Sequence, residues 1–122
     1  FQFNGVVGMP GNVSVAPVGT ALAVASGNEV LVTLTNVPDN QRVTVTLTNV
    51  DGFVNPPPAS IGFLVGDVNN SRSVNSLSLT SVKARSGQIV TDANFQFDLN
   101  VSGTITAADV STVKARSGFA LP

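Results

Sequence analysis

The strongest constraint on the fold is an internal duplication in the second half of the chain. The segment "SVKARSG" at residues 81–87 recurs as "TVKARSG" at residues 112–118, an offset of 31 residues. The same offset separates two twelve-residue runs, "DVNNSRSVNSLS" from Asp67 and "DLNVSGTITAAD" from Asp98. A match of this length at a fixed offset indicates a duplicated structural unit. Each copy consists of a polar loop followed by a short segment with apolar periodicity.

That segment predicts a short helix in each copy. Leu79 and Val82 in the first copy, and Val110 and Val113 in the second, are three residues apart, and a glycine follows each pair. This spacing places both apolar side chains on one face of a helix, and glycine often ends a helix. Between the copies, "TDANFQF" begins with Thr91, a good N-cap residue. It predicts a third, brief helix that packs Phe95 or Phe97 onto the pair.

The polar loop of the second copy has the spacing of a calcium site. Calcium takes about six to eight oxygen ligands, and a twelve-residue loop supplies them from positions 1, 3, 5, 7, 9 and 12, with glycine sixth. The corresponding ligands are Asp98, Asn100, Ser102, the carbonyl of Thr104, Thr106 and Asp109, and Gly103 is sixth. The alternative is an Asx-rich turn that caps a helix and leaves Asp109 in solvent. The agreement at six positions and the duplication favour calcium.

The loop of the first copy is a weaker version of the same pattern. Its corresponding residues are Asp67, Asn69, Ser71, the carbonyl of Ser73, Asn75 and Ser78. Arg72 stands where glycine belongs, and Ser78 stands where the second carboxylate belongs. A non-glycine residue in the left-handed conformation costs on the order of 1 kcal/mol, and one carboxylate attracts a divalent ion less than two. We therefore predict firm calcium binding in the second loop, and weak binding or hydrogen bonds alone in the first.

The duplicated Asp-x-Asn-x-Ser loop followed by a short helix resembles a type I dockerin, a calcium-binding module of cellulosomes and of other bacterial and archaeal extracellular proteins. The resemblance covers about residues 66–122. It implies two calcium sites, a near twofold module, secretion, and a cohesin partner. In that family the tenth and eleventh loop positions and a basic residue near the seventeenth often contact the cohesin. The corresponding residues are Ser76, Leu77, Lys83, Ala107, Ala108 and Lys114, and the alanine pair departs from the hydroxyl-rich family pattern.

Residues 1–65 predict a β-sandwich. "NVSVAPV" at 12, "EVLVTLTNV" at 29 and "RVTVTLTNV" at 42 alternate apolar and polar residues, the period of a strand with one buried face. "FQFNGVV", "TALAVA" and "SIGFLV" are weaker candidates, which brings the count to about six strands. The strand pattern resembles the immunoglobulin-like modules that precede such dockerins. Two readings of the short strand count stay open: a small or truncated sandwich, or an open edge that a strand from another copy completes.

The composition excludes several classes of function. The chain has no His and no Cys, so it has no Ser/His/Asp triad, no thiolate nucleophile and no zinc site of the usual kind. The acidic residues fall in turns and in the two loops, and we expect no enzymatic activity. Six basic and seven acidic residues, with no Tyr or Trp, argue against nucleic-acid binding. No apolar stretch is long enough to span a membrane.

The junction between the two halves favours one function over another. The strand "SIGFLV" runs through Gly66 directly into Asp67 with no flexible linker, so we expect two rigidly coupled modules, 1–65 and 66–122. A chain that opens on Phe1 is expected to be a processed product or a fragment. The sequence favours an extracellular or cell-surface structural subunit, stabilised by calcium, that assembles with copies of itself into a fibre or surface layer by strand exchange and module packing. The alternative is a dockerin tail that anchors a larger secreted protein to a cohesin-type partner.

Overall fold

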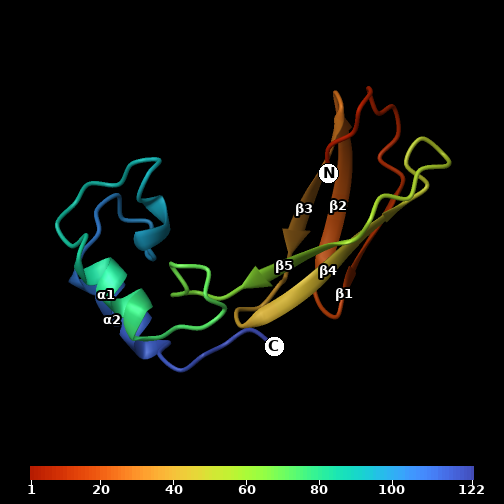
Figure 1. Cartoon of the computed structure of the whole chain (residues 1–122). Coiled ribbons are helices and arrows are strands. Elements are labelled where there is room, and N and C mark those ends of the chain that lie inside the picture. Colours follow the sequence, from red (N-terminus) through yellow and green to blue (C-terminus); the bar gives the residue numbers. More distant parts are fainter. The chain divides into compact units, whose positions relative to one another are not determined.

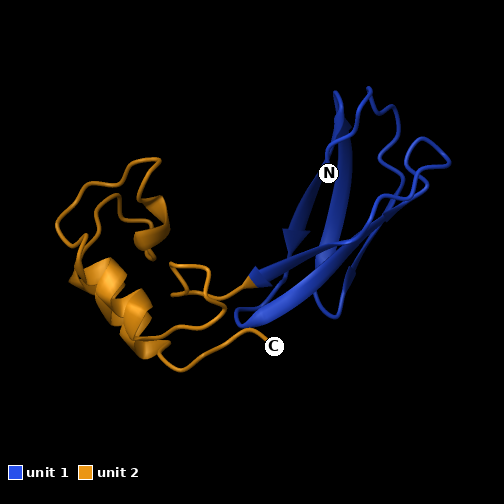
Figure 2. Ribbon diagram, in the orientation of Figure 1, with its two compact units in different colours: residues 1–62 blue, residues 63–122 orange.

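The computed structural model describes all residues from Phe1 to Pro122, and they form two compact units (Figures 1 and 2). The first unit, Phe1–Gly62, contains the strands, and the second, Phe63–Pro122, contains the helices. The division lies close to the junction expected between residues 65 and 66. Whether the two units behave as independent domains stays a prediction.

Two β-sheets form the first unit. One sheet has the order β1–β4–β5, with β1 at Asn12–Ala16, β4 at Gln41–Thr48 and β5 at Ala59–Phe63. The other pairs β2, Thr20–Ser26, with β3, Glu29–Thr35. Both ladders with a known register, β1 with β4 and β2 with β3, are antiparallel. The unit is therefore mainly β, as predicted.

Five strands form, where about six were expected, because "FQFNGVV" makes only an isolated bridge between Gln2 and Glu29. The chain bends at Asn4 and Gly5, directly after the bridge, and so leaves the edge of β3. Asn and Gly both favour turns over strand interiors. The sixth candidate strand is therefore only a contact of residues 1–3 with the edge of β3.

The two sheets share one apolar core. Alternation along β4 buries Val43, Val45 and Leu47, and Leu47 belongs to a cluster that also contains Val30 of β3. Side chains from both sheets pack onto this cluster, including Val13, Ala23, Ala25 and Val32. The sheets therefore face each other, as in a sandwich. The more specific immunoglobulin-like assignment stays a prediction.

Two α-helices form the second unit and lie side by side (Figure 1). Helix α1 spans Ser76–Lys83 and α2 spans Ala107–Ala115. The core of this unit consists of Val74, Val82, Phe97, Ile105 and Val113. Leu79 and Val110 pack against it, so the apolar pairs three residues apart do form the inner face of each helix, as predicted.

The segment between the repeats forms a short 3₁₀ helix, η1, at Phe95–Phe97. Phe97 is buried in the core and Phe95 is exposed, which decides between the two candidates. Thr91 is not the N-cap that the sequence predicted, because Asn94 occupies that position. Thr91 instead donates from its backbone N and its hydroxyl to Oδ1 of Asn94, at 2.6 and 3.2 Å. Residues 91–94 therefore form a hydrogen-bonded turn before η1 begins.

Reciprocal hydrogen bonds join the two halves of the second unit. The eighth residue of each loop bonds to the segment that follows the helix of the other repeat. The bonds are Val74 N to Phe119 O at 2.8 Å, Gly118 N to Val74 O at 2.9 Å, Ile105 N to Gln88 O at 2.9 Å, and Gly87 N to Ile105 O at 2.7 Å. Each bond of one repeat has its counterpart 31 residues away in the other. The halves are thus related by an approximate twofold operation.

Candidate functional site

An aspartate at the first position closes each loop by accepting hydrogen bonds from the backbone. In the second loop, Asp98 Oδ1 accepts from Ser102 N at 3.1 Å and Oδ2 accepts from Gly103 N at 2.8 Å. Asp67 makes the same two contacts in the first loop, with the backbone N of residues 71 and 72 at 3.0 and 2.7 Å. The two loops therefore share one hydrogen-bond frame, even though only one has glycine at the sixth position.

The ninth position, predicted as a ligand position, carries a helix cap in both loops. Asn75 is the N-cap of α1, and its Oδ1 accepts from the backbone N of Leu77 and Ser78. Thr106 is the N-cap of α2, and its Oγ1 accepts from Ala108 N at 3.2 Å. Each loop therefore runs directly into the helix that follows it.

Asp109, at the twelfth position, is fully buried and organises the second loop. Its Oδ1 accepts from Leu99 N at 2.8 Å and Asn100 N at 3.3 Å, and its Oδ2 accepts from Thr106 N at 2.7 Å and Thr106 Oγ1 at 3.1 Å. Burial raises the pKa of this carboxyl, but the hydrogen bonds from Thr106, Leu99 and Asn100 outweigh burial and lower its pKa below the ordinary value. Asp109 is therefore not in solvent, as the alternative expected, but the helix-capping part of that alternative holds, because Asp109 and Thr106 form a capping box at the start of α2.

Ser78 occupies the twelfth position of the first loop and is also fully buried. Its hydroxyl donates to Asn69 Oδ1 at 3.4 Å, which is a long contact. The neighbouring Ser71 hydroxyl donates to the backbone O of Ser73 at 2.9 Å. At the twelfth position the first loop therefore has a neutral hydroxyl with one long contact, where the second loop has a carboxylate with four donors.

Each loop places two residues in the left-handed region. At the sixth position these are Arg72, with φ of 65°, and Gly103, with φ of 84°. At the fourth position they are Asn70 and Val101, both with φ of 55°. Asn tolerates this conformation, whereas a β-branched residue there is an outlier. Sequence reasoning found the misfit at Arg72 and missed the one at Val101.

The donor set of the second loop fits calcium better than that of the first. A carboxylate offers about four lone-pair sites. The two hydrogen bonds of Asp98 leave some of these sites for a metal, whereas Asp109 accepts four hydrogen bonds, so a calcium ion would have to replace some of them or attract Asp109 as a second negative charge beside the ion. No group of three His, Cys, Asp or Glu side chains gathers in the chain, so Asn100, Ser102 and the Thr104 carbonyl would have to complete the shell. Two carboxylates and neutral oxygens suit a hard cation. The first loop offers one carboxylate, Asp67, and a weaker fit.

The residues expected to contact a partner lie on the surface of α1 and α2. Four of them form the first turns of the two helices, and two lie toward the helix ends. All six side chains are exposed: Ser76, Leu77, Lys83, Ala107, Ala108 and Lys114. Leu77 is 64% exposed, a large value for an apolar side chain at the start of a helix. The structure thus leaves equivalent positions of the two repeats free for contact.

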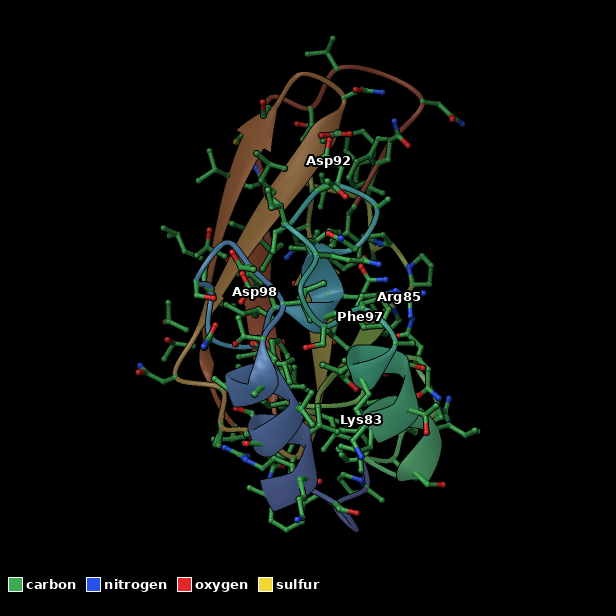
Figure 3. The ribbon with its side chains drawn as sticks, turned by 90° about the vertical axis from the view of Figure 1, so that its left-hand side faces the viewer. Lys83, Arg85, Asp92, Phe97 and Asp98 are labelled. Atoms are coloured by element: carbon green, nitrogen blue, oxygen red, sulfur yellow. The ribbon has the colours of Figure 1, made fainter.

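The two basic residues of each "KARSG" segment have different surroundings. Lys83 is exposed at the end of α1, whereas the guanidinium carbon of Arg85 lies 4.0 Å from the centre of the Phe97 ring (Figure 3). Arg85 Nη1 also donates to Ser81 O at 3.0 Å. Arg85 therefore packs over the buried Phe97 ring, and Lys83 is the basic residue available to an acidic partner.

Asn94 was not identified as important from the sequence. Its side chain is mostly buried, accepts from Thr91 and donates to Ile89 O at 3.1 Å. It fixes the connection between the repeats and so positions Asp98, which follows η1. The pattern of a threonine with Asn three residues later was a usable signal, because Asn side chains commonly bond to nearby backbone groups.

The comparison with protein families identifies the second unit. The family model of the Dockerin type I domain matches residues 65–116. This range contains both loops and both α-helices, so a dockerin domain is present in the second unit. Searches of curated proteins and of solved structures found no match. None of the helices has the length and apolar character needed to cross a membrane.

Proposed function

We propose that this chain is a non-enzymatic assembly protein of the extracellular space or cell surface, and that its dockerin domain binds a cohesin-type partner. The observation that carries the proposal is the equivalent exposure of the six candidate contact residues on α1 and α2. The match to the Dockerin type I domain supports the same conclusion. The three loop aspartates are engaged with backbone groups of their own loops, which suits a structural role for these carboxylates.

Calcium would act on the shape of the binding surface. A bound ion supplies positive charge that holds several oxygen ligands of one loop together. The ligands would be Asp98, Asn100, Ser102, the Thr104 carbonyl and Asp109 in the second loop, with Asp67 as the only carboxylate of the first. Because each loop ends at the N-cap of its helix, fixing the loop fixes the first turn of that helix. The partner would then meet a preformed surface, which reduces the entropy lost on binding.

The exposed surface combines an apolar and a basic element. Leu77 supplies apolar area beside Ser76 at the start of α1, and Lys83 supplies charge near its end. Ala107, Ala108 and Lys114 are the counterparts on α2, with less apolar area. A partner surface with an apolar patch bordered by carboxylates would complement either helix. We expect α1 to contribute more binding energy because Leu77 buries more apolar area than an alanine.

The test is binding of the full chain to a panel of recombinant cohesin modules, with calcium and with a chelator. We expect a calcium-dependent complex that Leu77→Asp weakens by about tenfold or more, because an unpaired carboxylate would enter the interface. Ser86→Asp adds the same charge at an exposed position outside the six residues and serves as the matched control. Equal binding by both variants, or no calcium-dependent complex with any module, would contradict the proposal.

Assembly of copies into a fibre or surface layer is the second candidate, and one feature of the first unit favours it. In β2 the small residues Ala21, Ala23 and Ala25 face the core, so the larger Leu22 and Val24 face outward. Leu22 is 65% exposed, and Val24 and its cross-strand partner Leu31 are each 53% exposed. An apolar patch on the outer face of a sheet is typical of a protein contact.

Light scattering and electron microscopy of the purified chain, with and without calcium, test this second candidate. We expect concentration-dependent assemblies that Val24→Lys disrupts, since a charge would lie in the centre of the apolar patch. Ser14→Lys, on the exposed face of β1 in the other sheet, adds the same charge away from the patch and should disrupt less. Monomers at all concentrations and under both conditions would rule out self-assembly and leave binding to a cohesin-type partner unaffected.

A further inference from the structure

The sandwich of the first unit is closed on one side and open on the other. Strands β1 and β2 contact each other, whereas β5 and β3 are the free edges of their sheets. Between these edges lies a cavity of about 250 Å³, lined by Phe1, Val32, Leu34, Val45, Ala59 and Ile61. The lining contains no charged side chain, and Ile61 is 41% exposed beside it. The open seam is thus an apolar groove between two strand edges.

The first residues of the chain already occupy one end of this seam as a short strand. Phe1 exchanges both backbone hydrogen bonds with Val30 of β3, at 2.9 Å from Val30 N to Phe1 O and 3.1 Å from Phe1 N to Val30 O. Gln2 forms an antiparallel bridge with Glu29, and Phe3 N donates to Asn28 O at 2.8 Å. The edge of β3 therefore accepts an added antiparallel strand, and the register of that strand is fixed.

Continuing this register along β3 leads directly into the cavity. In an antiparallel ladder, alternate residues direct their backbone groups to the same edge, so the N–H and C=O of Val32 and Leu34 point to the edge that Val30 uses. The side chains of Val32 and Leu34 line the cavity. A strand that continued beyond Phe1 would pair with these residues, and its side chains opposite them would enter the cavity.

The size and chemistry of the cavity indicate what enters it. Sites for small molecules usually enclose about 300–1,000 Å³ and place a few polar groups for orientation. This cavity is smaller and is lined by apolar side chains only, while the backbone groups of the free edge of β3 run along its rim. Apolar side chains of an added strand would fill the cavity. The backbone of that strand would form hydrogen bonds with the backbone groups along the rim.

We propose that the seam between β3 and β5 is a strand-acceptor site for an extended segment of another polypeptide chain, bound antiparallel to β3, with apolar residues opposite Val32 and Leu34. The residues opposite Leu31 and Thr33 face outward and need not be apolar. The proposal concerns residues 1–62 and does not depend on cohesin binding. A donor strand from a second copy would serve self-assembly, but the acceptor site stands without it.

The first experiment titrates a seven-residue peptide of alternating Thr and Val, with blocked ends, into the ¹⁵N-labelled full chain. We expect saturable shifts of the amide signals of Val32 and Leu34 and of residues 59–61, and no comparable shifts in the second unit. A peptide with Lys in place of each Val should not bind, because its charges would enter an apolar cavity. Absence of saturable shifts along this edge would overturn the proposal.

A substitution inside the cavity tests whether peptide binding needs the cavity as well as the edge of β3. Ala59→Leu fills part of the cavity from β5 and should weaken the peptide by about tenfold, because the donor side chains lose their space. Thr33→Leu adds similar bulk on the outer face of β3 and should leave binding unchanged. Equal weakening by both variants would contradict a site inside the seam.

An extension of the chain fixes the register and gives the sharpest test. Adding Val-Thr-Val-Thr before Phe1 places the two Val side chains opposite Leu34 and Val32, whereas Thr-Val-Thr-Val has the same composition and points its Val side chains outward. We expect the first extension to raise the thermal stability of the first unit and to abolish peptide binding. The second extension should do neither. Equal effects of the two extensions would overturn the proposal and leave the tests of cohesin binding and self-assembly untouched.

Discussion

The two loops of the dockerin domain reach the same backbone shape by different means. Asp67 and Asp98 hold the same backbone amides, and both loops end at an N-cap residue. At the twelfth position the first loop has a buried hydroxyl with one long contact, and the second has a buried carboxylate with four donors. The shape of the loop is therefore a property of its first and ninth positions. The twelfth position changes its charge and its rigidity.

The difference also shows that neither loop is the better one in every respect. The first loop has Asn70 in the left-handed conformation at the fourth position and a poorly suited Arg72 at the sixth. The second loop reverses this, with a suitable Gly103 at the sixth position and a poorly suited Val101 at the fourth. Each copy thus carries one unfavourable backbone conformation, and the two lie at different positions. Variants of the two copies can separate charge from backbone strain.

The largest expected effect comes from removing the buried carboxylate. Asp109→Ala leaves the backbone N of Leu99, Asn100 and Thr106 without their acceptor, and we expect it to reduce the free energy of unfolding of the second unit by about 3 kcal/mol or more. The matched change Ser78→Ala removes one long contact and should cost about 1 kcal/mol. Denaturant unfolding in the presence of a chelator, monitored by amide signals of residues 63–122, measures both.

Asp109→Ala and Asp67→Ala together rank the two loops as calcium sites. We expect calcium titration to lose more affinity through Asp109→Ala than through Asp67→Ala, because the second loop combines two carboxylates. A larger loss from Asp67→Ala would reverse the ranking of the loops. Equal losses would indicate that the two loops contribute equally to calcium binding.

The next effect comes from giving the first loop the missing charge. Ser78→Asp places a second carboxylate beside the backbone positions equivalent to those that hold Asp109, and we expect calcium to bind the first loop about tenfold more tightly. Isothermal titration should then show two sites of similar affinity. Ser86→Asp adds the same charge outside the loop. If it strengthens calcium binding as much as Ser78→Asp does, the gain is a general charge effect and the comparison at the twelfth position fails.

Exchanging residues at the fourth position tests the strain that the second loop carries. Val101→Asn should stabilise the second unit by about 1 kcal/mol, and Asn70→Val should destabilise it by a similar amount, since a β-branched side chain is costly at positive φ. Arg72→Gly should also stabilise the unit, by less than about 1 kcal/mol, because glycine loses more freedom on folding. Thermal unfolding with a chelator present measures all three. No gain from Val101→Asn would mean that the loop relaxes its backbone at no cost.

The sequence predicted those parts of this domain that follow from periodicity and from duplication. The inward-facing Val82 and Val113, the two loops and the left-handed Arg72 all follow from residues compared 31 positions apart. The left-handed Val101 was missed, although Asn70 at the equivalent position of the first loop was a usable signal, because Asn is enriched in that conformation. Val101 is 89% exposed, so side-chain packing does not set its conformation. The N-cap role of Thr91 was wrong: η1 begins after Asn94, whose side chain makes no capping hydrogen bond and instead accepts from Thr91.

The sandwich was predicted less completely. Strong alternation identified β1, β3 and β4, and "TALAVA" and "SIGFLV" also form strands. In β2, however, the alanines face inward and the larger residues outward, opposite to what hydrophobicity alone favours. Ala23 and Ala25 pack against a cluster that contains the larger Val30, Leu47 and Val50, so small side chains of β2 face larger ones in the core. The opening between β3 and β5 could not be predicted from the number of strands, because it depends on which strands lie at the edges of the two sheets and which of these edges contact each other.

The smallest expected effect concerns the arginine that follows each helix. Arg85 lies 4.0 Å from the centre of the Phe97 ring, and Arg116 lies 5.9 Å from the centre of the Phe119 ring. Phe97 is buried and Phe119 is 44% exposed, so the cation–π attraction should be stronger in the first repeat. Replacing each arginine by methionine keeps an apolar stem over the ring and removes the charge. We expect Arg85→Met to lose about 1 kcal/mol of unfolding free energy through the lost cation–π contact and the lost hydrogen bond to Ser81 O, and the cation–π contact of Arg116 to contribute less. Denaturant unfolding of the two single variants measures the difference, and a smaller loss in Arg85→Met than in Arg116→Met would show that the distance to the ring does not govern this pair.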